Sequence, residues 1–211
     1  MSEAGRLAYA DRSVYEADPD FYTPPEGLLD DAYLRARSQS ISTTGSLGRA
    51  TPGDPPPIAA PARNAAWGED TALQFPSTSH ISVVDQYGNA VAMTTTIEDQ
   101  FVYDATGRVY MVAGSPGGSA IINYVTKTLV GVLDWGLDPQ RAIDLPNFGS
   151  GNGPTELEAN TSVAALAPKL RALGHEVSVM EHTSGLHAIV RTKRGWIGGA
   201  DPRREGTVKG G

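Results

Sequence analysis

The sequence predicts an α+β fold, in which strands grouped in hairpins alternate with separate helical stretches. After residue 78, two stretches rich in β-branched residues flank a short turn at 86–89, and a second hairpin pattern has its turn at 104–107. Apolar residues then recur with a helical period from residue 121 until Gly136. This grouping favours stacked sheets flanked by helices over a doubly wound parallel sheet.

Shorter elements complete the prediction. Helices are expected at 3–16, 30–38, 139–145 and 162–173, and strands at 155–159, 176–181, 186–192 and 195–200. Asp30 or Asp31 is expected at the N-terminus of the second helix, where an anion is favoured. Gly174 is a typical C-terminal cap for the helix that precedes it.

Residues 43–77 separate the N-terminal helices, at 1–42, from the strand-rich region at 78–211. This stretch is rich in Pro, Gly, Ala and Ser, and no hydrophobic period runs through it. We therefore expect an exposed, mobile linker, which is also where a chain is cut most easily.

Composition limits the classes of function. The chain has 211 residues, of which 40% are hydrophobic, and its formal net charge of -7 argues against a nucleic-acid partner. The absence of cysteine excludes disulfides, thiolate zinc sites and cysteine nucleophiles. No apolar run reaches the length of a membrane span, and the first residues lack the apolar middle of a signal peptide. We expect either a cytosolic protein or a chain that begins downstream of its natural start.

Thr78 stands at the junction between the linker and the first strand. A threonine hydroxyl needs a base to become a nucleophile. Cleavage between Ser77 and Thr78 would expose an α-amino group with an ordinary pKa of about 7.7–8.0, which could serve as that base. The alternative is that Thr78 only begins a strand, as β-branched residues often do.

A second candidate is the segment SPGGS, at 115–119. Two glycines after a strand let backbone N–H groups approach a ligand closely, and the start of a helix favours an oxyanion. The alternative is a tight connection between a strand and a helix.

Three threonines at 94–96, followed by Glu98, form a third candidate. Thr94 and Thr96 point to the same side of a strand, so they could lie beside the start of the partner strand and hydrogen-bond Thr78. The alternative is β-propensity on a solvated face.

The histidines and the C-terminal charges are weaker candidates. His80 shares the face of Thr78 and is interpreted as structural, because an N-terminal amine removes the need for another base. Three further histidines have no metal-ligand spacing with carboxylates: His175, His182 and His187. Asp201, Arg203 and Arg204 could form a substrate or interface patch, but a solvated turn with local ion pairs is the usual arrangement of such a group.

Together, these motifs resemble the γ-glutamyltranspeptidases, and the resemblance covers nearly the whole chain. TSHISVVDQYGNAVAMTTTIEDQF resembles the strand pair that begins with the family's nucleophilic threonine, and VAGSPGGSAIINYV resembles its glycine-pair motif. GGADPRREG resembles its C-terminal signature, and RLAYADRSVYEADPDF and GLLDDAYLRARSQSI resemble the last helices of its large subunit.

The resemblance implies a four-layer αββα sandwich of the N-terminal-nucleophile hydrolase type, incomplete in this chain. Residues 1–42 would be the tail of the large subunit, and 78–211 the catalytic small subunit. Thr78 would be the nucleophile in self-processing and in transfer, and Thr96 would orient it. Gly117 and Gly118 would supply oxyanion-hole N–H groups.

Substrates and partners also follow from the resemblance. It assigns Glu98 and Ser115 to substrate binding. The substrate would be a γ-glutamyl amide such as glutathione, with an acceptor amine or water, and no metal or organic cofactor would be needed. The rest of the precursor's large subunit would be the protein partner. A periplasmic or secreted location is implied, with a cytoplasmic one as the alternative.

The chain departs from the family's pattern in several places. Ser79 replaces a frequent second threonine. Glu98 stands where many members have asparagine, whereas other branches, including cephalosporin-acylase-like ones, resemble this chain at that position. Between the positions of Phe101 and Val102, the family has tens of further residues that this sequence lacks, and they include a lid and substrate-gripping groups. The body of the family's large subunit, which would come before Met1, is also absent from this sequence. We expect that the sequence joins segments of a longer protein.

Three functions therefore stay open. The first is γ-glutamyl transfer or hydrolysis, and the second is an acylase of the same fold that acts on a dicarboxylic acyl amide. The third is a non-catalytic fragment or pseudoenzyme that serves as a structural partner.

Overall fold

A computed structural model describes residues 1–16, 23–56, 80–94 and 99–210. The chain divides into two compact units. Unit one comprises Met1–Leu73, Gly149–Leu157 and Ala164–Val179, and unit two comprises Gln74–Phe148, Glu158–Val163 and Met180–Gly211. Two segments from the strand-rich region at 78–211 thus belong with the N-terminal helices.

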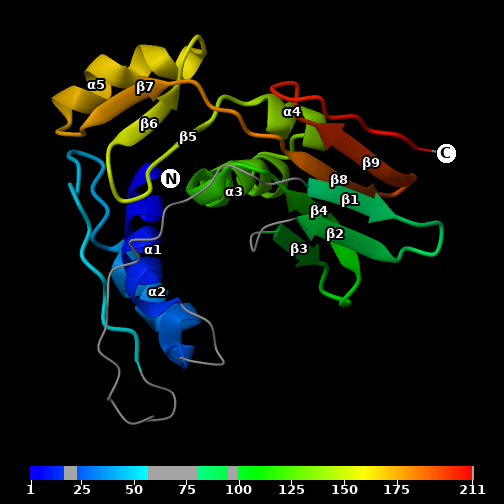
Figure 1. Cartoon of the computed structure of the whole chain (residues 1–211). Coiled ribbons are helices and arrows are strands. Elements are labelled where there is room, and N and C mark those ends of the chain that lie inside the picture. The colour runs from blue at the N-terminus through cyan, green and yellow to red at the C-terminus, as the bar shows by residue number, and fades with distance from the viewer. Residues whose placement is uncertain (17–22, 57–79, 95–98, 211) are drawn as a thin grey trace. The chain divides into compact units, whose positions relative to one another are not determined.

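The described elements form an α+β protein, as the sequence predicts (Figure 1). The helices are α1 Ser2–Tyr15, η1 Glu26–Leu29, α2 Asp31–Ser38, η2 Gly118–Ala120, α3 Ile121–Leu133, α4 Pro139–Asp144, η3 Ser162–Leu166 and α5 Ala167–Ala172. The strands are β1 His80–Val84, β2 Ala90–Thr94, β3 Asp99–Tyr103, β4 Val109–Gly114, β5 Phe148–Gly149, β6 Thr155–Glu158, β7 Val177–Met180, β8 His187–Thr192 and β9 Gly195–Ala200.

Most of the expected elements are confirmed. Asp30 caps α2 by accepting hydrogen bonds from the N–H groups of Ala32 and Tyr33. The helix expected at 162–173 is divided into the 3₁₀ helix η3 and the α-helix α5. Two short elements, η1 and β5, were not predicted from the sequence.

Unit one is held together by charged side chains inside it as well as by a small core of Leu7, Ala10 and Ala50. Arg37 on α2 forms an ion pair of 2.7 Å with Asp11 on α1. The hydroxyl of Tyr33 donates to the same carboxylate at 2.8 Å. These contacts fix α1 and α2 to each other.

The first part of the linker, residues 43–56, is mostly exposed but forms hydrogen bonds with the rest of unit one. The N–H of Leu47 donates to Glu3 at 3.0 Å, and the carbonyl of Gly48 accepts from Arg6 at 3.0 Å. The N–H of Ala50 donates to the side-chain carbonyl of Asn152 at 2.8 Å. Charged and amide side chains thus satisfy an irregular backbone. Residues 57–77 lie outside the described part of the chain.

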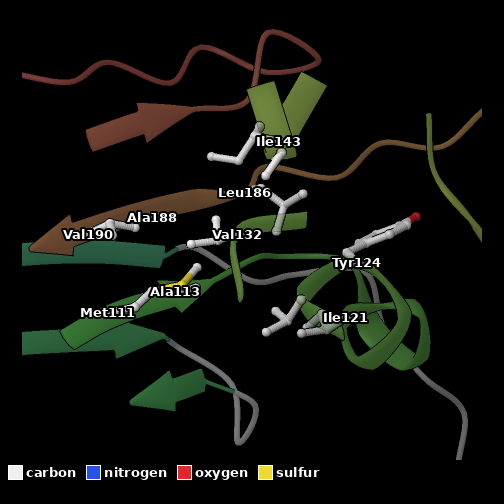
Figure 2. Packing of buried hydrophobic residues seen from close by; sticks show 11 residues of the cluster. Met111, Ala113, Ile121, Tyr124, Val132, Ile143, Leu186, Ala188 and Val190 are labelled. Atoms are coloured by element: carbon white, nitrogen blue, oxygen red, sulfur yellow. The ribbon is translucent and has the colours of Figure 1, made fainter. Parts of the chain in front are cut away.

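Unit two contains a four-stranded antiparallel sheet in the order β3-β4-β8-β9. Its buried apolar side chains pack with α3 and α4, and Figure 2 shows several of them in one cluster. The cluster consists of Met111, Ala113, Ile121, Tyr124, Val125, Val132, Ala142, Ile143, Leu186, Ala188 and Val190. Because side chains alternate along a strand, Val112 and Gly114 face the other side of this sheet.

The hairpin of β1 and β2 packs on that other side (Figure 1). His80 is buried at the start of β1, whereas Ile81 and Val83 are exposed, so alternate residues face the four-stranded sheet. Within unit two, the hairpin, the four-stranded sheet, and α3 with α4 thus form three layers.

A second, three-stranded sheet has the order β5-β6-β7. None of the helices in the described ranges is both long enough and apolar enough to cross a membrane.

Candidate functional site

The structure describes three of the residues that the sequence analysis assigns to the site: Ser115, Gly117 and Gly118. The other four lie outside the described residues: Ser77, Thr78, Thr96 and Glu98. The described half of the site is therefore the glycine turn, at the junction of β4, η2 and α3.

The glycine pair has a backbone conformation that favours glycine at both positions. Gly117 has a φ of 146° and Gly118 a φ of 57°. A Cβ built on Gly117 would lie 2.6 Å from Cε2 of Tyr124, well inside contact distance. Within the described part of the chain, no group accepts a hydrogen bond from the N–H of either glycine. Both donors stand where a helix begins, which favours a negatively charged ligand.

Ser115 is wholly buried, and its hydroxyl is used within the protein. It donates to the carbonyl of Pro116 at 2.7 Å and accepts from the N–H of Gly185 at 3.2 Å. A Cβ on Gly185 would lie 2.7 Å from Cγ of Pro116, so the two segments touch. In this structure the hydroxyl of Ser115 ties the glycine turn to the segment between β7 and β8, and its contact with substrate stays a prediction.

Asp201 holds that segment from the opposite side. Its carboxylate accepts from the hydroxyl of Ser184 at 2.6 Å and from the N–H of Leu186 at 3.1 Å. The side-chain amide of Asn147 donates to Ser184 at 2.7 Å. All of these groups are buried, so the segment that contacts Pro116 is fixed by hydrogen bonds.

Arg203 extends the same network, and the expectation of a solvated turn at 201–204 is wrong for Asp201 and Arg203. Asp201 is 1% exposed, and Arg203 contacts Glu158 at 2.8 Å and Asp201 at 3.1 Å. Burial alone would raise the pKa of Glu158, but hydrogen bonds from Arg203 and from the N–H of Asn147 hold it below its usual value. The turn is a buried ion-pair network because its partner, Glu158, comes from a distant part of the sequence.

Lys127 on α3 is also fully buried. Its ammonium group donates to the carbonyls of Ile143 at 3.0 Å and Leu145 at 2.7 Å, at the end of α4. Burial, together with the nearby charge of Arg203, lowers the pKa of Lys127 to about 7. The side chain therefore closes the last turn of α4 and belongs to the scaffold behind the glycine turn.

The ring of Tyr124 packs against Gly117, and His182 holds that ring in place. The hydroxyl of Tyr124 and Nδ1 of His182 share a hydrogen bond of 2.9 Å, and the two rings meet edge to face with centroids 5.7 Å apart. Burial lowers the pKa of His182, which favours its neutral form. The two residues are 58 positions apart, so no local pattern in the sequence predicts the pair.

His80 marks the other side of the site, at the start of β1. Its ring stacks on that of His187, with centroids 6.3 Å apart and planes 29° apart. Burial and the neighbouring His187 lower the pKa of His80 to about 4, so the ring is neutral at physiological pH. The structural interpretation of His80 agrees with this environment.

In the described ranges, no three residues of the types His, Cys, Asp and Glu cluster in a way that could hold a metal ion. The polar groups around the glycine turn bond to one another instead. What the turn offers to a ligand is a pair of backbone N–H donors on a rigid support, which is suited to stabilising a developing negative charge.

The chain is similar to several known proteins. A family model described as gamma-glutamyltranspeptidase matches residues 1–102 and 100–211. The glutathione hydrolase proenzyme of Escherichia coli (strain K12) is 29% identical over 259 residues, which cover 96% of this chain and 42% of the relative. The acylase ACY 1 proenzyme of Pseudomonas sp. (strain SE83) is 25% identical, with 95% of this chain and 41% of the relative covered.

Among solved structures, cephalosporin acylase from Bacillus halodurans is similar with a TM-score of 0.69 and 20% identity, over 99% of this chain and 44% of that chain. This likeness confirms the predicted α+β fold. The chain spans less than half the length of the curated relatives described above.

Proposed function

Because the chain belongs to the γ-glutamyltranspeptidase family, we propose that it contains the catalytic threonine of a self-processing enzyme that transfers or hydrolyses γ-glutamyl groups. Cleavage between Ser77 and Thr78 would expose the amino group of Thr78. Glutathione-like γ-glutamyl amides would be the acyl donors. Water or an amine would be the acceptor.

In the proposed reaction, Thr78 supplies both the nucleophile and the base. Its hydroxyl oxygen attacks the γ-carbonyl carbon of the substrate while its own amino group takes the hydroxyl proton. The N–H groups of Gly117 and Gly118 stabilise the oxyanion, and the proton passes to the departing amine. Water or an acceptor amine then attacks the γ-glutamyl ester and releases Thr78.

The geometry of the glycine pair is the observation that carries this proposal. Gly117 and Gly118 adopt positive φ values, and their N–H groups donate to no acceptor in the described residues. Removing one oxyanion-hole donor from a serine protease costs about 10²–10³ in rate, and a loss of the same order is expected here.

The pairing of β1 with β2 supports the proposed role of Thr96. The described register sets His80 opposite Thr94 in an antiparallel ladder. Thr78 lies two residues before His80, and Thr96 lies two residues after Thr94. Thr78 and Thr96 both lie outside the described residues, so the hydrogen bond between them is part of the proposal.

Turnover of matched acyl donors tests the proposal. The full-length protein is expected to release p-nitroaniline from γ-glutamyl-p-nitroanilide, and Thr78→Ala is expected to abolish release. Thr78→Ser keeps a hydroxyl and should retain measurable activity. Unchanged turnover by Thr78→Ala would contradict the proposal.

An acylase of the same fold is the second candidate. Glu98 stands where many γ-glutamyltranspeptidases have asparagine, and one relative is an acylase proenzyme. A glutaryl donor lacks the amino group of a γ-glutamyl donor, so it separates the two activities. Faster turnover of glutaryl-p-nitroanilide than of the γ-glutamyl compound would favour the acylase.

The junction at Phe101–Val102 keeps the non-catalytic candidate open. The two stretches that the family model matches meet at residues 100–102, where the resemblance expects a missing segment. In the structure, β3 runs across this junction, and its register with β4 shifts between Val102 and Tyr103. A sequence of the gene through this position would test whether the segment is present in the natural protein.

The proposed partner is the large-subunit portion of the same precursor, of which 1–42 would be the tail. The proposed location is the periplasm or the exterior of the cell, as the family resemblance implies. Fractionation of cells that express the full-length protein would test the location.

A further inference from the structure

The His80 ring fills the space that Gly114 leaves beside β4. A Cβ on Gly114 would lie 2.2 Å from Cε1, 2.3 Å from Nδ1 and 2.8 Å from Nε2 of His80. These are its three nearest heavy atoms outside the neighbouring residues, and all of them belong to one ring. Gly114 does not have a positive φ, so its backbone would admit alanine. His80 is therefore the obstacle to a side chain at position 114.

Other groups hold the ring in this place. His187 stacks on it and lies directly opposite Gly114 in the ladder of β4 and β8. Nε2 of His80 shares a hydrogen bond of 2.7 Å with the hydroxyl of Ser82 on the same strand. With 7% of its surface exposed, His80 is enclosed between the β1–β2 hairpin and the four-stranded sheet.

The contact lies close to both halves of the proposed site. Thr78 precedes His80 by two residues, and Gly117 follows Gly114 by three. Because each residue spans at most about 3.6 Å of chain, only a short length of chain separates this contact from either half of the proposed site. A misplacement of about 1 Å at reacting groups can cost on the order of 10²-fold in rate.

We propose that the His80 ring, seated against Gly114, is a positioning group that aligns the strand following Thr78 with the glycine pair. The role is steric and requires no proton transfer by His80. The inference rests on the proposed function, because it takes Thr78 as the nucleophile and the glycine pair as the oxyanion hole.

A double-mutant cycle in the full-length protein tests this role. The variants are Gly114→Ala, His80→Ala and the two together. The measurements are kcat and KM for γ-glutamyl-p-nitroanilide per cleaved molecule, with cleavage quantified by mass spectrometry. Gly114→Ala should lower kcat on the order of 10²-fold and leave KM nearly unchanged, because the new Cβ displaces the ring.

The double variant gives the decisive comparison. His80→Ala removes the ring atoms that are the three nearest to the new Cβ at position 114. The kcat of the double variant should therefore lie within about twofold of that of His80→Ala alone. Independent effects, in which the two losses multiply, would overturn the proposal.

Two variants in unit one serve as matched controls. Gly153→Ala adds a Cβ with no atom within 4 Å, and His175→Asn removes a mostly buried ring whose Nδ1 contacts Thr155. Both should leave kcat per cleaved molecule unchanged, even if they lower Tm. If Gly114→Ala does not fold, His80→Gln is measured in its place. A fall in kcat at constant KM would support the positioning role, and an unchanged kcat would overturn it.

Failure of this inference can be told from failure of the proposed function. If the wild-type protein neither cleaves itself nor turns over the donor, the proposed function falls, and the positioning role falls with it. If the wild type does both and the cycle is additive, only the positioning role falls.

Discussion

The two strands that border the proposed site differ in how they are covered. On β4, Met111 and Val112 point to opposite faces, and both are 0% exposed. On β1, His80 and its neighbours on the inner face meet the four-stranded sheet, whereas Ile81 and Val83 are each 51% exposed. Within the described residues, β4, which leads to the glycine pair, is thus covered on both faces. The strand β1, which follows Thr78, is covered on one face only.

This difference teaches where the rigidity of the site originates. The glycine turn is held by Ser115, by the segment between β7 and β8, and by the network around Asp201. The strand that begins at His80 pairs with β2 and meets the four-stranded sheet on one face, where the His80 ring lies against Gly114 and His187. Damage to the network should therefore act on stability first, and damage to the ring contact should act on alignment.

Loss of Arg203 should have the largest effect on the well-supported half. Arg203→Met leaves the carboxylates of Glu158 and Asp201 buried without their guanidinium partner. Removing one member of a buried ion pair costs about 3–5 kcal/mol of unfolding free energy. Urea unfolding would measure this loss, and a variant as stable as the wild type would contradict the role of the network.

Gly117→Ala should damage chemistry more than it damages folding. The residue has a φ of 146°, and a Cβ there would lie 2.6 Å from Tyr124, so the turn must shift. Disturbing one oxyanion donor should lower kcat about 10²–10³-fold. Steady-state kinetics would measure the loss. Gly153→Ala, whose Cβ meets nothing within 4 Å, is the control that should keep full activity.

The supported face of β1 should make stability depend on pH. The folded protein holds the pKa of His80 near 4, below the value of 6.5 expected in the unfolded chain. As the pH falls from 6.5 towards 4, the unfolded chain takes up a proton that the folded chain resists, so the unfolding free energy falls by about 3 kcal/mol. Above pH 6.5 this contribution is fully present.

The difference between the wild type and His80→Asn isolates that contribution. His182 also has a lowered pKa, and it adds a slope of the same sign in both proteins. Unfolding free energies measured between pH 4 and 7 should show a shallower slope for the variant. Equal slopes would show that His80 is not the group that titrates.

A matched pair of substitutions tests the comparison of the two strands directly. Val112→Thr places a hydroxyl on a fully buried side of β4 and should cost about 1–3 kcal/mol. Val91→Thr makes the same change on β2, where the side chain is 56% exposed, and should stay within about 0.5 kcal/mol of the wild type. Equal losses would mean that the outer face of the hairpin is covered in solution.

Local patterns in the sequence predict the two hairpins, α3 and the glycine caps, because these depend on neighbouring residues. The hairpin turns at 86–89 and 104–107, for example, connect strands that pair with each other. Periodicity likewise indicates α3, whose apolar face packs on the four-stranded sheet.

Contacts between distant parts of the chain leave no such pattern. Arg203 looks like part of a solvated turn until the fold brings Glu158 to it. The anchoring of the linker through Ala50 depends on Asn152, about a hundred residues away. The match between His80 and Gly114 is invisible for the same reason, since each residue alone is ordinary in its strand.

Intact mass spectrometry of the full-length protein, wild type and Thr78→Ala, tests the central claim most directly. The wild type should give two chains under denaturing conditions, the smaller one beginning at Thr78, and Thr78→Ala should give one uncleaved chain. A single uncleaved mass for the wild type, or cleavage at the same bond in Thr78→Ala, would contradict the assignment of Thr78 as the nucleophile.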